Sequence, residues 1–123
     1  MTHALTPAQV TAALRAALEG DDLHALLDLL APHTRWAPTP EAVPANAPRA
    51  TILNWYAQLH ASGTRARIEE SFTYPDAVVL GLAQARSGSP ALYQVFQIGD
   101  GRITSVQGHA DRYEALGDAY RTP

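Results

Sequence analysis

The segment 93–109 constrains the fold of this chain most strongly, because two alternating runs flank a Gly-Asp-Gly turn. Apolar and polar residues alternate along 93–98 and again along 102–109, and the turn at 99–101 separates the two runs. An Asp-Gly pair between alternating runs is the strongest short-range signal for a β-hairpin. We therefore expect the chain to end in antiparallel strands.

Helical signals dominate the first half of the chain. Thr6 and Pro7 supply a capping hydroxyl and a proline at the first helical position, so a helix is expected to begin there and to end at Gly20. A second helix is expected at 23–30, before an Ala-Pro pair that stops it, and a third at 49–60.

Strands and loops are expected in the remaining segments. Period-two alternation predicts strands at 65–73 and 77–86, and a short strand is expected at 33–37. The segment 38–48 contains four prolines, which cannot donate to a regular hydrogen-bond ladder, so we expect a loop that covers part of the molecule.

The order of these elements indicates an α+β fold in which helices lie on one face of an antiparallel sheet. The tail 112–120 is expected to form a short helix that Gly117 interrupts. At 123 residues the chain is expected to be one domain, 1–123, built around one core.

Composition excludes several kinds of partner. The formal net charge of -3 argues against nucleic acid and anionic membranes, since both require clustered Lys and Arg.

The chain has no Cys, so disulfides and thiolate nucleophiles are excluded. It shows no signal peptide and no apolar run long enough to span a bilayer, so a cytoplasmic location is expected.

Four local stretches, taken with the order of elements, carry a resemblance to a known family. They span nearly the whole chain: Glu19–Leu26, Leu30–Trp36, Arg49–Tyr56 and Asp100–Ile103. Together they resemble the nuclear-transport-factor-2-like superfamily, and within it the SnoaL-like branch of small bacterial proteins.

The resemblance implies a cone-shaped α+β barrel, in which a curved antiparallel sheet wraps around the long third helix and encloses a pocket. It also implies a homodimer formed through the convex face of the sheet. The superfamily includes isomerases, cyclases, dehydratases, epoxide hydrolases and noncatalytic binding or transport proteins, so the fold alone does not select a function. No cofactor is expected.

Ketosteroid isomerase chemistry is disfavoured by three positions. Those enzymes carry a base Asp before the proline that follows the first strand, a Tyr in the first helix and a neutral Asp before the final turn. The matching positions here hold Ala37, Leu14 and Gln94, and Phe96 is one pleat from Gln94 in an alternative register. Gln94 can donate to an oxyanion but cannot act as a general acid or base.

The resemblance and the residue types together predict a ligand pocket. Tyr56 is expected to donate a hydrogen bond inside the cone, with Gln94 as a second polar contact and Arg35 at the mouth. Aromatic side chains are expected to line or floor the pocket: Trp36, Trp55 and Phe96. Core packing alone explains such aromatic residues equally well.

Three residues are candidate acids and bases. His109 and Asp111 are two apart and are expected to share a strand face, where the carboxylate would orient the imidazole. The alternative is that His109 faces solvent or a partner subunit while Asp111 and Glu114 form a capping box.

Glu70 lies between Ile68 and Phe72 on what is expected to be the apolar face, where burial would raise its pKa. The alternative is an exposed strand edge at which a carboxylate pairs with Arg86.

The leading interpretation is a SnoaL-like cone that binds a small, mostly apolar molecule. One alternative is a cofactor-free isomerase, cyclase, dehydratase or epoxide hydrolase, which requires Asp111, His109 or Glu70 to point into the cone. The other is a noncatalytic dimeric interaction module. The remaining histidines lack the spacing of a metal site, so no metal is expected.

Overall fold

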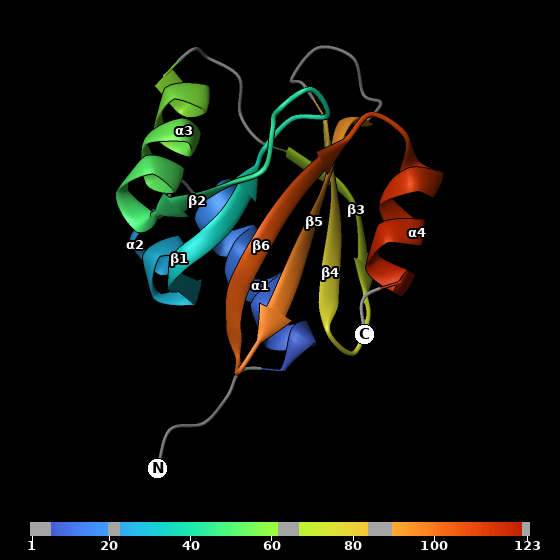
Figure 1. The fold of residues 1–123 in the computed structure, drawn as a ribbon, viewed down its shortest axis with the longest axis horizontal. Helices are drawn as coiled ribbons and strands as arrows, with labels where there is room; N and C mark the ends of the chain where they lie inside the picture. Colours follow the sequence, from blue (N-terminus) through green and yellow to red (C-terminus); the bar gives the residue numbers. More distant parts are fainter. Residues whose placement is uncertain (1–5, 20–22, 62–66, 84–89, 122–123) are drawn as a thin grey trace.

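The computed structural model describes residues 6–19, 23–61, 67–83 and 90–121. Within these ranges lie four helices and six strands (Figure 1). In chain order they are α1 (Pro7–Glu19), α2 (Leu23–Leu29), β1 (Leu30–Ala37), β2 (Ala45–Pro48), α3 (Arg49–Ala61), β3 (Arg67–Thr73), β4 (Ala77–Ala83), β5 (Pro90–Gly99), β6 (Arg102–His109) and α4 (Arg112–Arg121).

The strands form one sheet in the order β2-β1-β6-β5-β4-β3. All neighbouring pairs are antiparallel except β1 and β6, which are parallel. The expectation of a wholly antiparallel sheet is therefore wrong at this pair. β1 and β6 are far apart in sequence, so no turn between them sets their direction.

The sequence signals for a cap at the start of α1 and for a turn between β5 and β6 are confirmed. Thr6 Oγ1 accepts from the backbone N–H of Gln9 at 3.2 Å, and Gln9 Oε1 accepts from the N–H of Thr6 at 2.9 Å, which is a reciprocal cap at the start of α1. Asp100 and Gly101 have φ values of 53° and 74°, as a tight hairpin turn between β5 and β6 requires. The expected end of the first helix at Gly20 lies outside the described residues, as do residues 65–66 and 84–86 of the expected strands.

Helices cover both faces of the sheet, whereas one covered face was expected. One face packs against α1, α2 and α3 through the larger hydrophobic core, which includes Leu14, Ile52 and Phe96. We call this the three-helix face. The opposite face packs against α4 (Figure 1), and we call it the α4 face.

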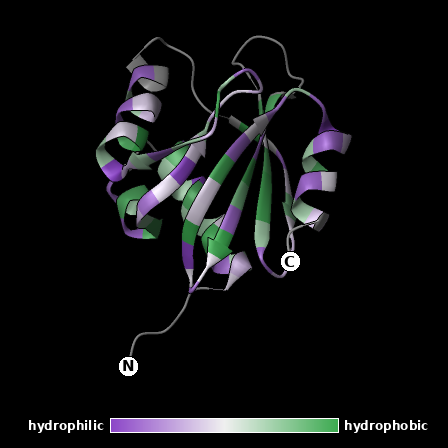
Figure 2. Ribbon diagram, in the orientation of Figure 1, coloured by the Kyte–Doolittle hydropathy of each residue, from purple (hydrophilic) through white to green (hydrophobic). Residues whose placement is uncertain are grey.

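The α4 face is apolar enough to hold a helix. Val79 and Val95 are completely buried there, and the small side chains of Ala115 and Ala119 allow α4 to pack closely. The helix continues through Gly117 because this tertiary packing offsets the cost of a helical glycine, about 1 kcal/mol. Figure 2 shows hydrophobic and hydrophilic bands on α4 and on the strands, as expected for elements with one buried side.

The proline-rich segment contains a strand, which corrects the expectation of a loop throughout 38–48. β2 pairs with β1 at the edge of the sheet, where His33 is the register partner of Pro48. Prolines are tolerated on an edge strand because the backbone N–H groups on its outer side have no neighbouring strand to donate to. β1 also begins earlier than expected, directly after α2.

An irregularity in β3 separates residues that were expected to share a face. The register with β4 shifts between Ile68 and Glu70. Ile68 packs into the core of the three-helix face, whereas Phe72 packs with the cluster on the α4 face. A bulge reverses the alternation of the side chains that follow it, so Glu70 does not lie on the face of Ile68.

No helix within the described ranges is long and apolar enough to cross a bilayer.

Candidate functional site

A buried phenol and a buried amide meet on the three-helix face. Tyr56 on α3 donates a 2.6 Å hydrogen bond to Oε1 of Gln94 on β5. Gln94 Nε2 in turn donates to the carbonyl of Pro38 at 3.0 Å. Both side chains are completely buried, and burial raises the pKa of Tyr56 far above its usual range although the bond to Gln94 lowers it. The phenol is therefore a neutral donor at all physiological pH values.

Two tryptophans extend this pair towards the surface. The rings of Trp36, Trp55 and Tyr56 contact one another edge to face, with centroid separations of 5.7 Å for the two tryptophans, 5.8 Å for Trp36 and Tyr56, and 4.9 Å for Trp55 and Tyr56. We call these three residues the aromatic group. Trp36 is buried and Trp55 is half-buried. The group therefore runs from the core to a partly exposed edge.

The proline-rich loop covers this region, as expected. A Cβ atom at Gly108 would lie 2.4 Å from the carbonyl oxygen of Pro38, so the loop rests directly on the backbone of β6. The same carbonyl accepts from Gln94. Only glycine permits this approach, and Gly108 and Gln94 together fix the position of the loop.

Two further residues were expected in the pocket, and only Phe96 shares the core of the aromatic group. Phe96 is almost fully buried and packs in the core of the three-helix face. Arg35 is exposed, and strand alternation places it on the opposite side of β1 from Trp36. Arg35 therefore does not lie beside the aromatic group. Leu14 and Ala37, which occupy two isomerase positions, are also buried in the core.

Glu70 belongs to the α4 face. Its carboxylate accepts a 3.2 Å hydrogen bond from the Tyr93 hydroxyl and lies 3.6 Å from Nε of Arg112. Burial, reinforced by the Glu70 charge, raises the pKa of Tyr93 above its usual value. The carboxylate is thus held by a phenol and a guanidinium, and Arg86, its alternative partner, lies outside the described residues.

Asp111 and His109 also lie outside the three-helix core. Asp111 is exposed and its carboxylate accepts from the backbone N–H of Glu114 at 3.2 Å, which caps α4 as in the alternative interpretation. His109 Nε2 pairs with Asp118 on α4 at 2.9 Å. The carboxylate that orients the imidazole is therefore Asp118 and not Asp111. All three candidate acids and bases lie on the α4 side, so none is placed to transfer a proton beside Tyr56.

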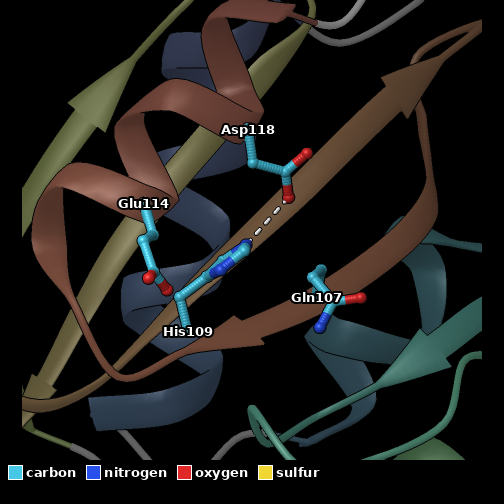
Figure 3. Close-up of a pocket in the computed structure, with 4 residues that line it drawn as sticks. All are labelled: Gln107, His109, Glu114 and Asp118. Atoms are coloured by element: carbon cyan, nitrogen blue, oxygen red, sulfur yellow. Dashed lines mark hydrogen bonds and ion pairs between the residues drawn. The ribbon is translucent and has the colours of Figure 1, made fainter.

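A pocket opens between β6 and α4 where this imidazole lies (Figure 3). Its volume is about 410 Å³, and it is lined by Gln107, His109, Glu114 and Asp118. Sequence reasoning identified only His109 as a site residue. The available signal was the spacing of Glu114 and Asp118, which are four residues apart and so share one face of a helix.

No protein-family model matches the chain, and no curated protein matches it in sequence. Solved structures do match its fold. A nuclear-transport-factor-2-like protein of unknown function from Mesorhizobium loti is 21% identical with a TM-score of 0.66, and the match covers 85% of this chain and 90% of that one. A SnoaL-like protein of unknown function from Burkholderia thailandensis is 16% identical with a TM-score of 0.66, over 85% of this chain and 94% of that one.

A third similar structure is an epoxide hydrolase from M. tuberculosis. It is 17% identical with a TM-score of 0.55, and the match covers 90% of this chain and 86% of that one. Identities this low establish a common fold and leave the chemistry of each protein to its own site.

Proposed function

We propose that this chain, which has the nuclear-transport-factor-2-like fold, binds a small, mostly apolar molecule on the three-helix face, beside the aromatic group. The hydrogen-bonded pair of Tyr56 and Gln94 is the observation that carries the proposal. Two polar side chains that are completely buried among aromatic residues can orient a ligand while the apolar walls supply most of the contact.

The chemistry of the pair indicates which ligands fit. The Gln94 amide has two N–H groups, and the Pro38 carbonyl accepts from one of them. The second N–H can donate to a ligand oxygen, and the Tyr56 oxygen can accept a further hydrogen bond. An apolar molecule with one carbonyl or hydroxyl group therefore matches the site.

Access to the site depends on the loop that begins at Pro38. Trp55 provides the half-buried edge of the aromatic group, and the loop closes the region above Gln94. The loop lifts to admit a ligand and closes again with the Pro38 carbonyl on one N–H of Gln94 and the ligand oxygen on the other.

The test compares an apolar ketone with its hydrocarbon counterpart. The chain has only two tryptophans, so NMR signals of their indole N–H groups report on the aromatic group directly. Titration with 1-indanone is expected to shift both signals in a saturable way. Indane is expected to bind roughly tenfold more weakly, because it has no oxygen to accept from the second N–H of Gln94.

Two variants check the role of the pair. Tyr56→Phe is expected to reduce the preference for indanone over indane, whereas Tyr120→Phe, which changes an exposed phenol on α4, is expected to leave it unchanged. Equal affinities of the wild-type protein for the two molecules, or shifts that miss both indoles, would refute the proposal.

A further inference from the structure

We propose that the pocket between β6 and α4 is a second binding site, and that it takes a small organic cation with at least two N–H donors, such as a primary ammonium. The pocket lies on the α4 face, whereas the aromatic group lies on the three-helix face. The sheet separates the two sites, so this inference does not depend on the proposed function.

The side chains converge because of helical and strand periodicity. Glu114 and Asp118 are one turn apart on α4, and Gln107 and His109 are two residues apart on β6. Figure 3 shows Glu114 and Asp118 reaching from the helix towards His109, with Gln107 on the same strand as His109. Both elements therefore present their polar side to the same space.

The hydrogen bond to Asp118 determines which ring nitrogen of His109 carries the proton. A carboxylate only accepts hydrogen bonds, so Nε2 of His109 carries the proton that Asp118 accepts at 2.9 Å. In the neutral ring Nδ1 then has a lone pair. Nδ1 can accept one N–H from a ligand in the pocket.

Glu114 supplies the charge. Its side-chain carboxylate has no hydrogen bond or ion pair with the residues that the structure describes. The nearest arginine in sequence, Arg112, is directed elsewhere: it lies 3.6 Å from Glu70 and 5.2 Å above the centre of the Phe72 ring. The pocket therefore favours a cation over an anion.

The geometry selects an organic cation rather than a metal ion. In the part of the chain that the structure describes, no three His, Cys, Asp or Glu residues are grouped so as to hold a metal. A volume of about 410 Å³ is within the range of small-molecule sites. An ammonium group can donate one N–H to Glu114 and one to His109.

The test is an NMR titration of the folded chain with benzylammonium. We expect saturable shifts of the backbone signals of Gln107, His109, Glu114 and Asp118. Benzyl alcohol lacks the charge and benzyltrimethylammonium lacks the N–H donors, so both are expected to bind at least roughly fivefold more weakly. The indole signals of the aromatic group are expected not to change.

Glu114→Gln is expected to weaken benzylammonium binding roughly fivefold or more, because it removes the charge and keeps the shape. Asp118→Asn, which removes the carboxylate that accepts from His109 Nε2, is expected to weaken benzylammonium binding as well. The matched control is Glu41→Gln, which removes the same charge from an exposed position outside the pocket.

Three outcomes would overturn the inference. Equal binding of benzylammonium and benzyl alcohol would show that charge is not recognised. Unchanged binding to the Glu114→Gln variant would show that the Glu114 carboxylate is solvated and does not contact the ligand. Shifts confined to the indoles of Trp36 and Trp55 would place the amine on the three-helix face instead.

Discussion

At the scale of single residues, the buried hydrogen bond between Tyr56 and Gln94 can be tested directly by measuring stability. Tyr56→Phe removes one O–H and leaves Gln94 Oε1 buried without its donor. We expect the free energy of unfolding to fall by about 1–3 kcal/mol, the cost of an unsatisfied buried acceptor. Urea denaturation measures this change.

The control for this measurement is Tyr120→Phe, because that phenol is 81% exposed. It is expected to change the free energy of unfolding by no more than about 0.5 kcal/mol. A loss of equal size in both variants would contradict the role assigned to the buried bond.

The raised pKa of Tyr56 also predicts how stability depends on pH. The folded state holds the phenolic proton more tightly than the unfolded state, in which the pKa is 10.0. Its contribution is therefore fully present below about pH 10 and is lost as the pH rises towards the folded-state value. The free energy of unfolding, measured by urea denaturation between about pH 10 and pH 11.5, should fall more steeply in the wild-type protein than in Tyr56→Phe, by up to about 1.4 kcal/mol per pH unit. Parallel pH profiles would rule out this assignment.

Gly108 offers a test of the contact that holds the proline-rich loop. A methyl group there would lie 2.4 Å from the Pro38 carbonyl oxygen, so Gly108→Ala must move the loop. We expect the free energy of unfolding to fall by about 1–3 kcal/mol, with NMR shifts at Gln94. Ala110→Val adds bulk at an exposed position and should change neither the free energy of unfolding nor the NMR signals of Gln94. A stable Gly108→Ala variant with an unmoved Gln94 signal would contradict the contact.

At the scale of elements, the sequence predicts what is local and misses what is not. The final hairpin and the first three helices were predictable because caps, turns and periodicity lie within each segment. The parallel pairing of β1 with β6 and the bulge in β3 depend on residues that are distant in sequence. No local pattern specifies them.

The same distinction applies to the candidate sites. The positions of Tyr56 and Gln94 could be predicted from the resemblance, and they do meet in the structure. Asp118 was missed because Gly117 suggested an interrupted helix, and a broken helix would not align Asp118 with His109. The continuity of α4 depends on burial of Ala115 and Ala119 against the sheet, a tertiary effect that helix propensity does not include.

The ion pair between α4 and β3 is expected to contribute little. Arg112 and Glu70 have side chains that are 46% and 32% exposed, and their charged atoms are 3.6 Å apart. A double-mutant cycle with Arg112→Ala and Glu70→Gln should give a coupling energy of about 0.2–1 kcal/mol, lower at high salt. A coupling well above this range, or one that salt does not change, would show that α4 depends on the pair more than its exposure suggests.

At the scale of the whole molecule, α4 covers the sheet face that the resemblance assigns to a dimer. Val79, Val95 and Ala77 are completely buried beneath it. A homodimer that buried these same residues would therefore require α4 to leave its packed position. What the helix hides is an apolar surface suited to self-association.

Displacing α4 should expose that surface and raise the mass of the protein in solution. Ala115→Glu with Ala119→Glu places two carboxylates against the sheet, where their burial is too costly for the helix to stay packed. Light scattering after size exclusion is expected to show a larger species than for the wild-type protein. The matched control places the same charges at the exposed positions of the same helix, Tyr113→Glu with Tyr120→Glu, and should leave the mass unchanged. If the first variant kept the wild-type mass and its native β-sheet spectrum, the uncovered face would not be self-associating, and α4 would serve mainly to form the pocket at His109.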